Sequence, residues 1–167
     1  GLLDVLFPDA QPLRKTAPKY YGKGGVLKHT LDSVKHFEEI VQGLSSWFGP
    51  AASKIRTYLA EKYAGYPRLA HCKWALLLHD IGKLVVAKLM PDAINAATLR
   101  AEESKTPYWK NEEPELHHTI AGKYLSEHWS FPAVLTACIC KHHEPEATTE
   151  SALVVSIIHI SDVTAHM

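Results

Sequence analysis

The chain is poor in cysteine and in long apolar runs. Its three cysteines, at positions 72, 138 and 140 of 167 residues, cannot form a complete set of disulfides. Its apolar runs are too short for a membrane-spanning helix, and no stretch resembles a secretory signal. These absences exclude a disulfide-stabilised secreted scaffold and predict a cytoplasmic protein without a membrane partner.

An excess of charge of one sign is also missing. Lys and Arg together number 18, and so do Asp and Glu, so the formal net charge is zero at pH 7. Without a global electrostatic field, the chain has no general attraction for nucleic acid or anionic lipid. A broad nucleic-acid-binding surface is therefore not expected.

The spacing of the apolar residues predicts an all-α fold, and the length suits a single domain. Apolar positions recur at steps of three and four over residues 25–45, which is typical of an amphipathic helix. Pro50, Pro67, Pro91 and Pro132 stand where further helices can begin. Residues 115–128 are predicted to be helical and residues 105–114 to form a polar loop. The last segment, 151–167, would also suit a buried strand, but no partner strand is available, so we predict a buried helix.

The first 24 residues differ from the rest of the chain. Three prolines and no helical period predict an extended arm over residues 1–24, anchored through Leu6 and Phe7. The helical domain is expected to occupy residues 25–167.

Eleven histidines are the unusual feature of the composition. Several histidines and two acids stand where a plain helical bundle would not need them: His29, His79, Asp80, His118, His142, His143 and Asp162. Asp162 falls on an otherwise apolar helix face, where an unpaired carboxylate is costly. The polar residues most abundant nearby are histidines, which are neutral at pH 7 and common metal ligands. The pattern therefore predicts a metal site.

Adjacent helical residues point about 100° apart, so His79 and Asp80 can face one ion only if the helix ends or bends there. Gly82 makes such a break plausible, and Pro145 suggests a helix end near His142 and His143. The candidate ligands are too many for one tetrahedral zinc. They suit two ions that share a carboxylate, with Asp80 as the candidate bridge.

The order of these residues resembles the pattern H…HD…H…HH…D of the HD superfamily of metal-dependent phosphohydrolases. It is carried by "LLHDIGK", "HTIAG", "KHHEP" and "HISD", within residues 25–164. The later part is especially similar to the HDOD and HD-GYP branches, in which a histidine stands four residues before a glycine. His118 stands so before Gly122, which selects it over His117. The opening "GGVLKHTLDSVKHFEEI" is also similar to HD domains appended to tRNA nucleotidyltransferases.

The resemblance implies an HD-domain helical bundle over residues 25–167 with two divalent ions. The first ion would be held by His29, His79, Asp80 and Asp162, and the second by Asp80, His118, His142 and His143. Iron or manganese is expected first, with magnesium, nickel, zinc and cobalt as alternatives. HDOD proteins often lack part of this set, whereas every position is filled here. The glycine-tyrosine-proline signature is replaced by "EPEATTESAL", which argues against cyclic di-GMP hydrolysis.

The implied activity is a phosphoric ester hydrolase acting on a nucleotide or other small phosphoester. A hydroxide activated by the two ions would attack phosphorus, with Asp80 and Lys83 as catalytic residues. Lys83 would offset charge on a phosphoryl oxygen, although a lysine is by itself more often exposed. Two alternatives stay open: a non-catalytic HDOD-like signalling or scaffold domain with partner domains, and a di-iron oxygenase.

The same side chains also have ordinary structural explanations. His29 lies on the polar side of its helix and could be as exposed as we expect His36 to be. A single His79 or His118 would more often be a hydrogen-bonded structural residue than a ligand, and only their joint occurrence favours metal. Cys138 and His142 are one helical turn apart, but a buried, unreactive cysteine is the better interpretation. The tryptophans at 47, 74 and 129 are expected to pack in the core or between parts of the domain, and not to form a base-stacking platform.

Overall fold

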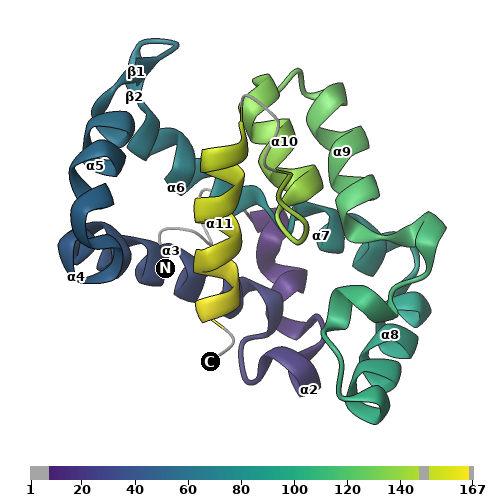
Figure 1. Ribbon diagram of the computed structural model, residues 1–167. Coiled ribbons are helices and arrows are strands. Elements are labelled where there is room, and N and C mark those ends of the chain that lie inside the picture. The colour runs from purple at the N-terminus through teal and green to yellow at the C-terminus, as the bar shows by residue number, and fades with distance from the viewer. Residues whose placement is uncertain (1–7, 147–150, 166–167) are drawn as a thin grey trace.

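Prolines and glycines divide the chain into the helices of a single all-α domain (Figure 1). The computed structural model describes residues 8–146 and 151–165. The elements in chain order are the 3-10 helix η1 (Pro8–Lys15), α2 (Pro18–Tyr21), α3 (Gly25–Gln42), α4 (Leu44–Phe48), the 3-10 helix η2 (Gly49–Ala51), α5 (Ala52–Ala60), β1 (Lys62–Tyr63), β2 (Tyr66–Pro67), α6 (Arg68–Leu78), α7 (Ile81–Leu89), α8 (Pro91–Ser104), the 3-10 helices η3 (Tyr108–Asn111) and η4 (Pro114–Leu116), α9 (His118–His128), α10 (Ala133–Lys141) and α11 (Ala152–Thr164).

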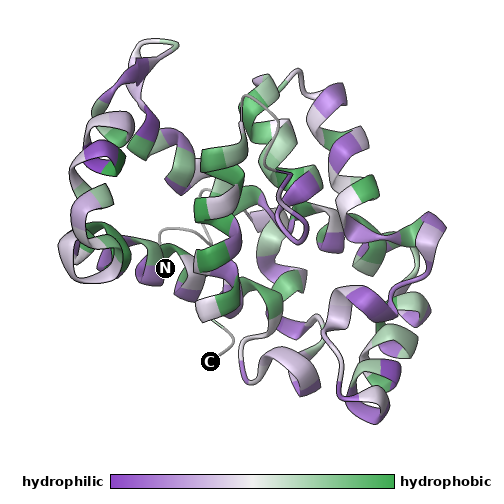
Figure 2. Cartoon of the chain, viewed as in Figure 1, coloured by the Kyte–Doolittle hydropathy of each residue, from purple (hydrophilic) through white to green (hydrophobic). Residues whose placement is uncertain are grey.

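The main core lies between α3, α5, α6, α10 and α11. It is built from apolar side chains that are almost fully buried, among them Phe37, Leu76, Cys138, Val155 and Ile158. In Figure 1, α11 crosses the molecule with α4 and α5 on one side and α9 and α10 on the other. Figure 2 shows α11 apolar along most of its length, as a helix packed on both sides requires.

The predicted helices are confirmed in type and approximate position. α3 begins at Gly25 and ends at Gln42, where Gly43 follows as its C-cap. The final segment forms the helix α11 and not a strand, and it buries Val154, Val155 and Ile158. Within the described ranges, no helix is both long enough and apolar enough to span a bilayer.

The described part of the N-terminal segment is helical, where an extended arm was expected. Residues 8–15 form η1 and residues 18–21 form α2, because a proline in a first turn has no N–H that the helix would need. Leu13 and Ala17 are buried in this segment. The expected anchors Leu6 and Phe7 lie outside the described residues, and the division into arm and domain stays a prediction.

A short antiparallel hairpin, β1–β2, interrupts the helices and was not predicted. Ala64 and Gly65 form its turn with positive φ angles of 47° and 87°, as a two-residue hairpin loop requires. Strands of two residues carry too little alternation to be recognised from sequence. They do not change the fold class.

The tryptophans do not pack in the core, which was one of the two placements expected for them. Trp47, Trp74 and Trp129 are 61%, 50% and 51% exposed. In α6 the buried residues Cys72, Ala75 and Leu76 follow the helical period, which turns Trp74 to the opposite side.

Candidate metal centre

Breaks between helices bring the histidines and acids of the centre to one point. α6 ends at Leu78 and α7 begins at Ile81, so His79 and Asp80 occupy the predicted break. α10 ends at Lys141, so His142 and His143 lie directly after its last residue. The first residue of α9 is His118. The remaining two residues, His29 and Asp162, lie within α3 and α11.

One half of the centre is formed around the Oδ2 atom of Asp80. His79 Nε2 lies 3.5 Å and His29 Nε2 3.9 Å from this oxygen. Asp162 Oδ1 lies 2.7 Å from His29 Nε2 and 3.4 Å from His79 Nε2. Residues 133 positions apart in sequence are thus in contact, and the four predicted residues of this half come together.

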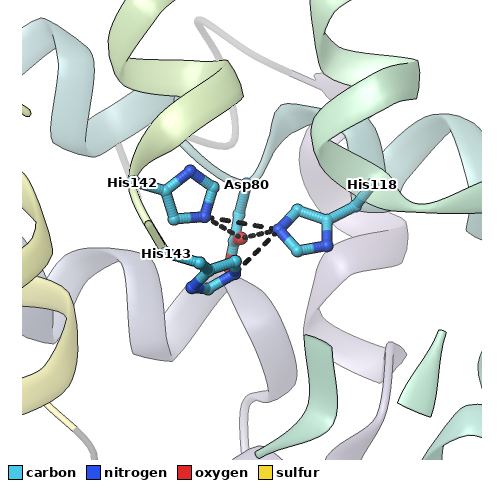
Figure 3. A group of neighbouring side chains, drawn as sticks. All are labelled: Asp80, His118, His142 and His143. Atoms are coloured by element: carbon cyan, nitrogen blue, oxygen red, sulfur yellow. Dashed lines mark hydrogen bonds and ion pairs between the residues drawn. The ribbon is translucent and has the colours of Figure 1, made fainter. Parts of the chain in front are cut away.

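The other half of the centre is formed around the Oδ1 atom of Asp80 (Figure 3). His118 Nε2 lies 3.4 Å and His142 Nε2 3.7 Å from this oxygen. His118 Nε2 is also 3.3 Å from His142 Nε2 and 3.1 Å from His143 Nε2. Ligand atoms about 2.0–2.1 Å from one ion, at tetrahedral or octahedral angles, lie about 3.0–3.4 Å apart. This half has approximately that spacing.

Hydrogen bonds on the outer side of His79 and His142 determine which nitrogen of each ring faces the centre. His79 Nδ1 donates to Leu76 O at 2.6 Å, and His142 Nδ1 donates to Ile139 O at 3.0 Å. When these rings are neutral, their Nε2 atoms therefore carry lone pairs directed at the centre. Two lone pairs 3.3 Å apart, as on His118 and His142, repel each other unless a proton or a cation lies between them.

The acids of the centre stay ionised. Burial alone would raise the pKa of Asp80, but His79 and Lys83 are the largest of several positive influences that hold it well below its usual range. Burial likewise opposes ionisation of Asp162, and its contacts with His29 and His79 hold its pKa well below the usual range. Both carboxylates are therefore available as ligands near neutral pH.

Two kinds of histidine lie beside these acids. Burial holds the pKa of His118 and of His142 well below the usual value, so both rings are neutral. For His79 burial also acts to lower the pKa, but Asp80 and Asp162 outweigh it and the pKa is raised. A cation bound here would therefore compete with a proton for His79.

The described residues leave buried polar atoms in the centre without a hydrogen bond, namely His79 Nε2 and both carboxylate oxygens of Asp80. Lys83 Nζ lies 2.7 Å from Asp80 Oδ1 and forms an ion pair with this oxygen. Buried atoms without a hydrogen bond, on neutral or anionic side chains, are typical of a cation site. The buried cluster of histidine and aspartate could therefore hold a metal ion.

Lys83 is buried, contrary to its ordinary interpretation as a surface lysine. Its side chain is 2% exposed, and Nζ donates to the hydroxyl of Tyr21 at 2.6 Å. His29 is buried as well, whereas His36 on the same helix is substantially exposed and contacts Glu39.

Glu112 was missed by the sequence analysis. It lies in the segment predicted to be a polar loop, and its carboxylate hydrogen-bonds to His118 Nδ1. Burial raises its pKa to about 7, with Lys83 and His117 acting against the rise. A glutamate in a polar stretch is normally exposed, so the sequence carries no clear signal for this contact.

A pocket of about 160 Å³ opens beside the centre. His143 and Asp162 connect the two, and aromatic residues form much of the wall: Tyr20, Tyr21, Tyr108 and Trp109. The Trp109 ring stacks on His143 with centroids 4.9 Å apart. Among the described residues that line it, none is a lysine or an arginine.

Comparison with known protein families gives a match to one family. Residues 33–145, more than half of the chain, match the HDOD domain. No curated protein and no solved structure matches the chain. The match covers His79, Asp80, His118, His142 and His143, with His29 and Asp162 on either side of it. The chain therefore belongs to the HDOD domain family.

Proposed function

We propose that this domain is a metal-dependent phosphohydrolase that acts on a nucleotide or another small phosphoester with two divalent ions. One observation carries the proposal: the two oxygens of Asp80 face two different groups of ligands. Oδ2 faces His29 and His79, and Oδ1 faces His118 and His142. A carboxylate with this arrangement can bridge two ions.

The proposed ligands of the first ion are His29, His79, Asp80 and Asp162. Those of the second ion are Asp80, His118, His142 and His143. When bound, such ions supply Lewis-acid catalysis and activate water for attack on phosphorus. Iron or manganese suits this mixture of imidazole and carboxylate ligands.

The chain's own residues bind and orient the substrate in this proposal. The pocket brings a phosphoryl group to His143 and Asp162, the residues that the pocket and the centre share. Aromatic walls would pack against a planar group such as a nucleobase. Because no lysine or arginine is among the described lining residues, an ester with one phosphoryl group is favoured over a polyphosphate.

Lys83 is the proposed source of positive charge for the transition state. Its ammonium lies 2.7 Å from Asp80 Oδ1 and is held behind the pocket by the hydroxyl of Tyr21. A fixed cation in a buried site stabilises charge that develops on phosphoryl oxygens without later reorganisation.

The test is elemental analysis of the purified protein together with a panel of phosphomonoesters and phosphodiesters, repeated on Asp80→Ala. We expect metal in the wild type, slow hydrolysis of at least one ester class, and loss of both in the variant. Asp32→Ala is the matched control, because Asp32 is not part of the centre and pairs with Lys28 on its own helix. Equal metal content in wild type and Asp80→Ala would sink the assignment of the bridge.

A second candidate is a non-catalytic scaffold domain of a signalling protein. The ion pair between Lys83 and Asp80 favours it, since an internal ammonium can neutralise the bridging carboxylate without any metal. On this alternative the metal-loaded protein hydrolyses nothing in the panel, and Asp80→Ala changes stability alone.

A further inference from the structure

Glu112 lies behind His118, on the side of the ring away from Asp80. One ring nitrogen of His118, Nε2, faces the Oδ1 atom of Asp80 at 3.4 Å. The other, Nδ1, contacts the Oε2 atom of Glu112. The glutamate side chain is only 3% exposed, although it does not belong to a helix whose packing would bury it.

His79, His118 and His142 differ in which group accepts a hydrogen bond from Nδ1, the ring nitrogen that points away from the centre. His79 and His142 follow the ends of α6 and α10, so carbonyl groups three residues earlier can accept from Nδ1. His118 is the first residue of α9 and has no preceding turn of its own helix to supply such a carbonyl. An acceptor for its Nδ1 must therefore come from elsewhere in the chain.

The neighbouring ring of His117 does not supply this acceptor, because both of its nitrogens have other partners. Its Nδ1 accepts from the backbone N–H of Thr119 at 3.3 Å, so the ring proton lies on Nε2. That Nε2 donates to Trp109 O at 3.1 Å. This is the tautomer opposite to the Nδ1–H form that the contact with Glu112 favours in the stacked ring of His118, and Oε2 of Glu112 lies 3.5 Å from His117 Nε2.

We propose that Glu112 is a positioning residue that keeps His118 in its Nδ1–H form and directs Nε2 at the metal centre. The inference rests on the proposed two-ion function. A carboxylate that accepts from the outer nitrogen of a metal-binding histidine fixes the ring and strengthens it as a ligand. When ionised, the carboxylate does so more strongly than a neutral carbonyl.

The test measures the tautomer of His118 and metal affinity in Glu112→Ala and Glu112→Gln. Nitrogen-15 NMR of the metal-free protein reports which ring nitrogen carries the proton, and a His118→Gln spectrum assigns the signal. We expect Nδ1–H in the wild type, a shift toward Nε2–H in Glu112→Ala, and retention of Nδ1–H in Glu112→Gln, whose amide oxygen can still accept from Nδ1. We expect affinity for manganese, measured by calorimetry, to fall about 10- to 100-fold in Glu112→Ala and by less in Glu112→Gln.

Glu115→Gln is the matched control, because Glu115 is an exposed glutamate of the same segment. It should keep the wild-type tautomer and affinity. An unchanged His118 tautomer in Glu112→Ala would overturn the proposal, even if this variant melts at a lower temperature. So would wild-type affinity despite a changed tautomer. A wild type without metal or hydrolysis would refute the proposed function, while the metal-free spectra would still decide whether Glu112 orients His118.

Discussion

Gly82 of α7 lies so close to His118 of α9 that a Cβ atom on residue 82 would come within 1.8 Å of the His118 carbonyl oxygen. The backbone nitrogen of Gly122 would lie 2.7 Å from the same Cβ. Because backbone atoms cannot give way as a flexible side chain can, Gly82→Ala must push the two helices apart. We expect a loss of about 1–3 kcal/mol or more in the free energy of unfolding, measured in urea. Metal content should also fall, since His118 moves with α9.

The matched control for this change is Gly43→Ala. Gly43 has an ordinary φ of −94°, and its nearest neighbour would be the side chain of Trp47 at 3.1 Å. Trp47 is largely exposed and can move. Stability should change by less than about 1 kcal/mol. If Gly82→Ala is tolerated as well as Gly43→Ala, the close approach of α7 and α9 is not needed for folding.

The number of ions lost should differ between ligands. Asp162 forms ion pairs with His29 and His79 of the first half and with His143, whereas His118 belongs to the second half. We therefore expect Asp162→Asn and His118→Ala each to lose one of two ions, and Asp80→Ala to lose both. Plasma mass spectrometry of the purified variants measures this. Complete loss in all three variants would indicate a single shared ion.

Part of this centre could be predicted because some of its residues leave a local trace in the sequence. Asp162 is an acid on an apolar helix face, and His79 and Asp80 follow an apolar run. The breaks that let adjacent residues share a centre were also predicted, from Gly82 and Pro145. The structure gives Gly82 a further role, since it admits α9 and does not only relax α7.

The parts that were not predicted depend on contacts between distant segments. Glu112 is buried only because the segment before α9 folds back over His118. Tyr108 in the same stretch is 2% exposed, although most residues of the segment 105–114 are polar. A period of apolar residues reports which face of one element is buried, but it does not report which loop covers another element.

The three thiols should differ in reactivity. Burial raises the pKa of Cys72 to about 12 and also raises that of Cys138, whereas Cys140 is only partly buried. Thiolates are the reactive species, so at pH 8 a maleimide or disulfide reagent should label Cys140 first and the other two only on unfolding. Because the thiol of Cys72 ionises at higher pH in the folded state, its contribution to stability is complete below pH 9 and is lost as pH rises toward 12.

Cys140→Ser is the control for this labelling experiment, and it should remove the fast phase. In the unfolded variant, the two remaining thiols should be labelled at the same rate as in the unfolded wild type. Rapid labelling of two or more thiols in the native wild type would contradict the packing of α6 against α10.

Lys83→Met decides between the two candidate functions. The substitution keeps most of the volume but removes the cation 2.7 Å from Asp80 Oδ1. Without metal, the variant should lose about 3–5 kcal/mol in the free energy of unfolding, because a buried carboxylate loses its partner. Lys54→Met, at an exposed position, should change little. Wild-type stability of metal-free Lys83→Met would show that the ion pair is unimportant.

Added manganese then separates a catalytic lysine from one that replaces a metal. If Lys83 acts on the phosphoryl group, Lys83→Met binds manganese as the wild type does, recovers most of its stability, and loses about 100-fold or more in kcat. If Lys83 instead serves as the permanent countercharge of Asp80, the variant binds manganese more tightly than the wild type, because an ammonium no longer competes for Oδ1. Wild-type protein would then show neither tight binding nor turnover. Titrating both proteins with manganese by calorimetry, alongside the ester assay, therefore tests whether this member of the family is an enzyme or a scaffold.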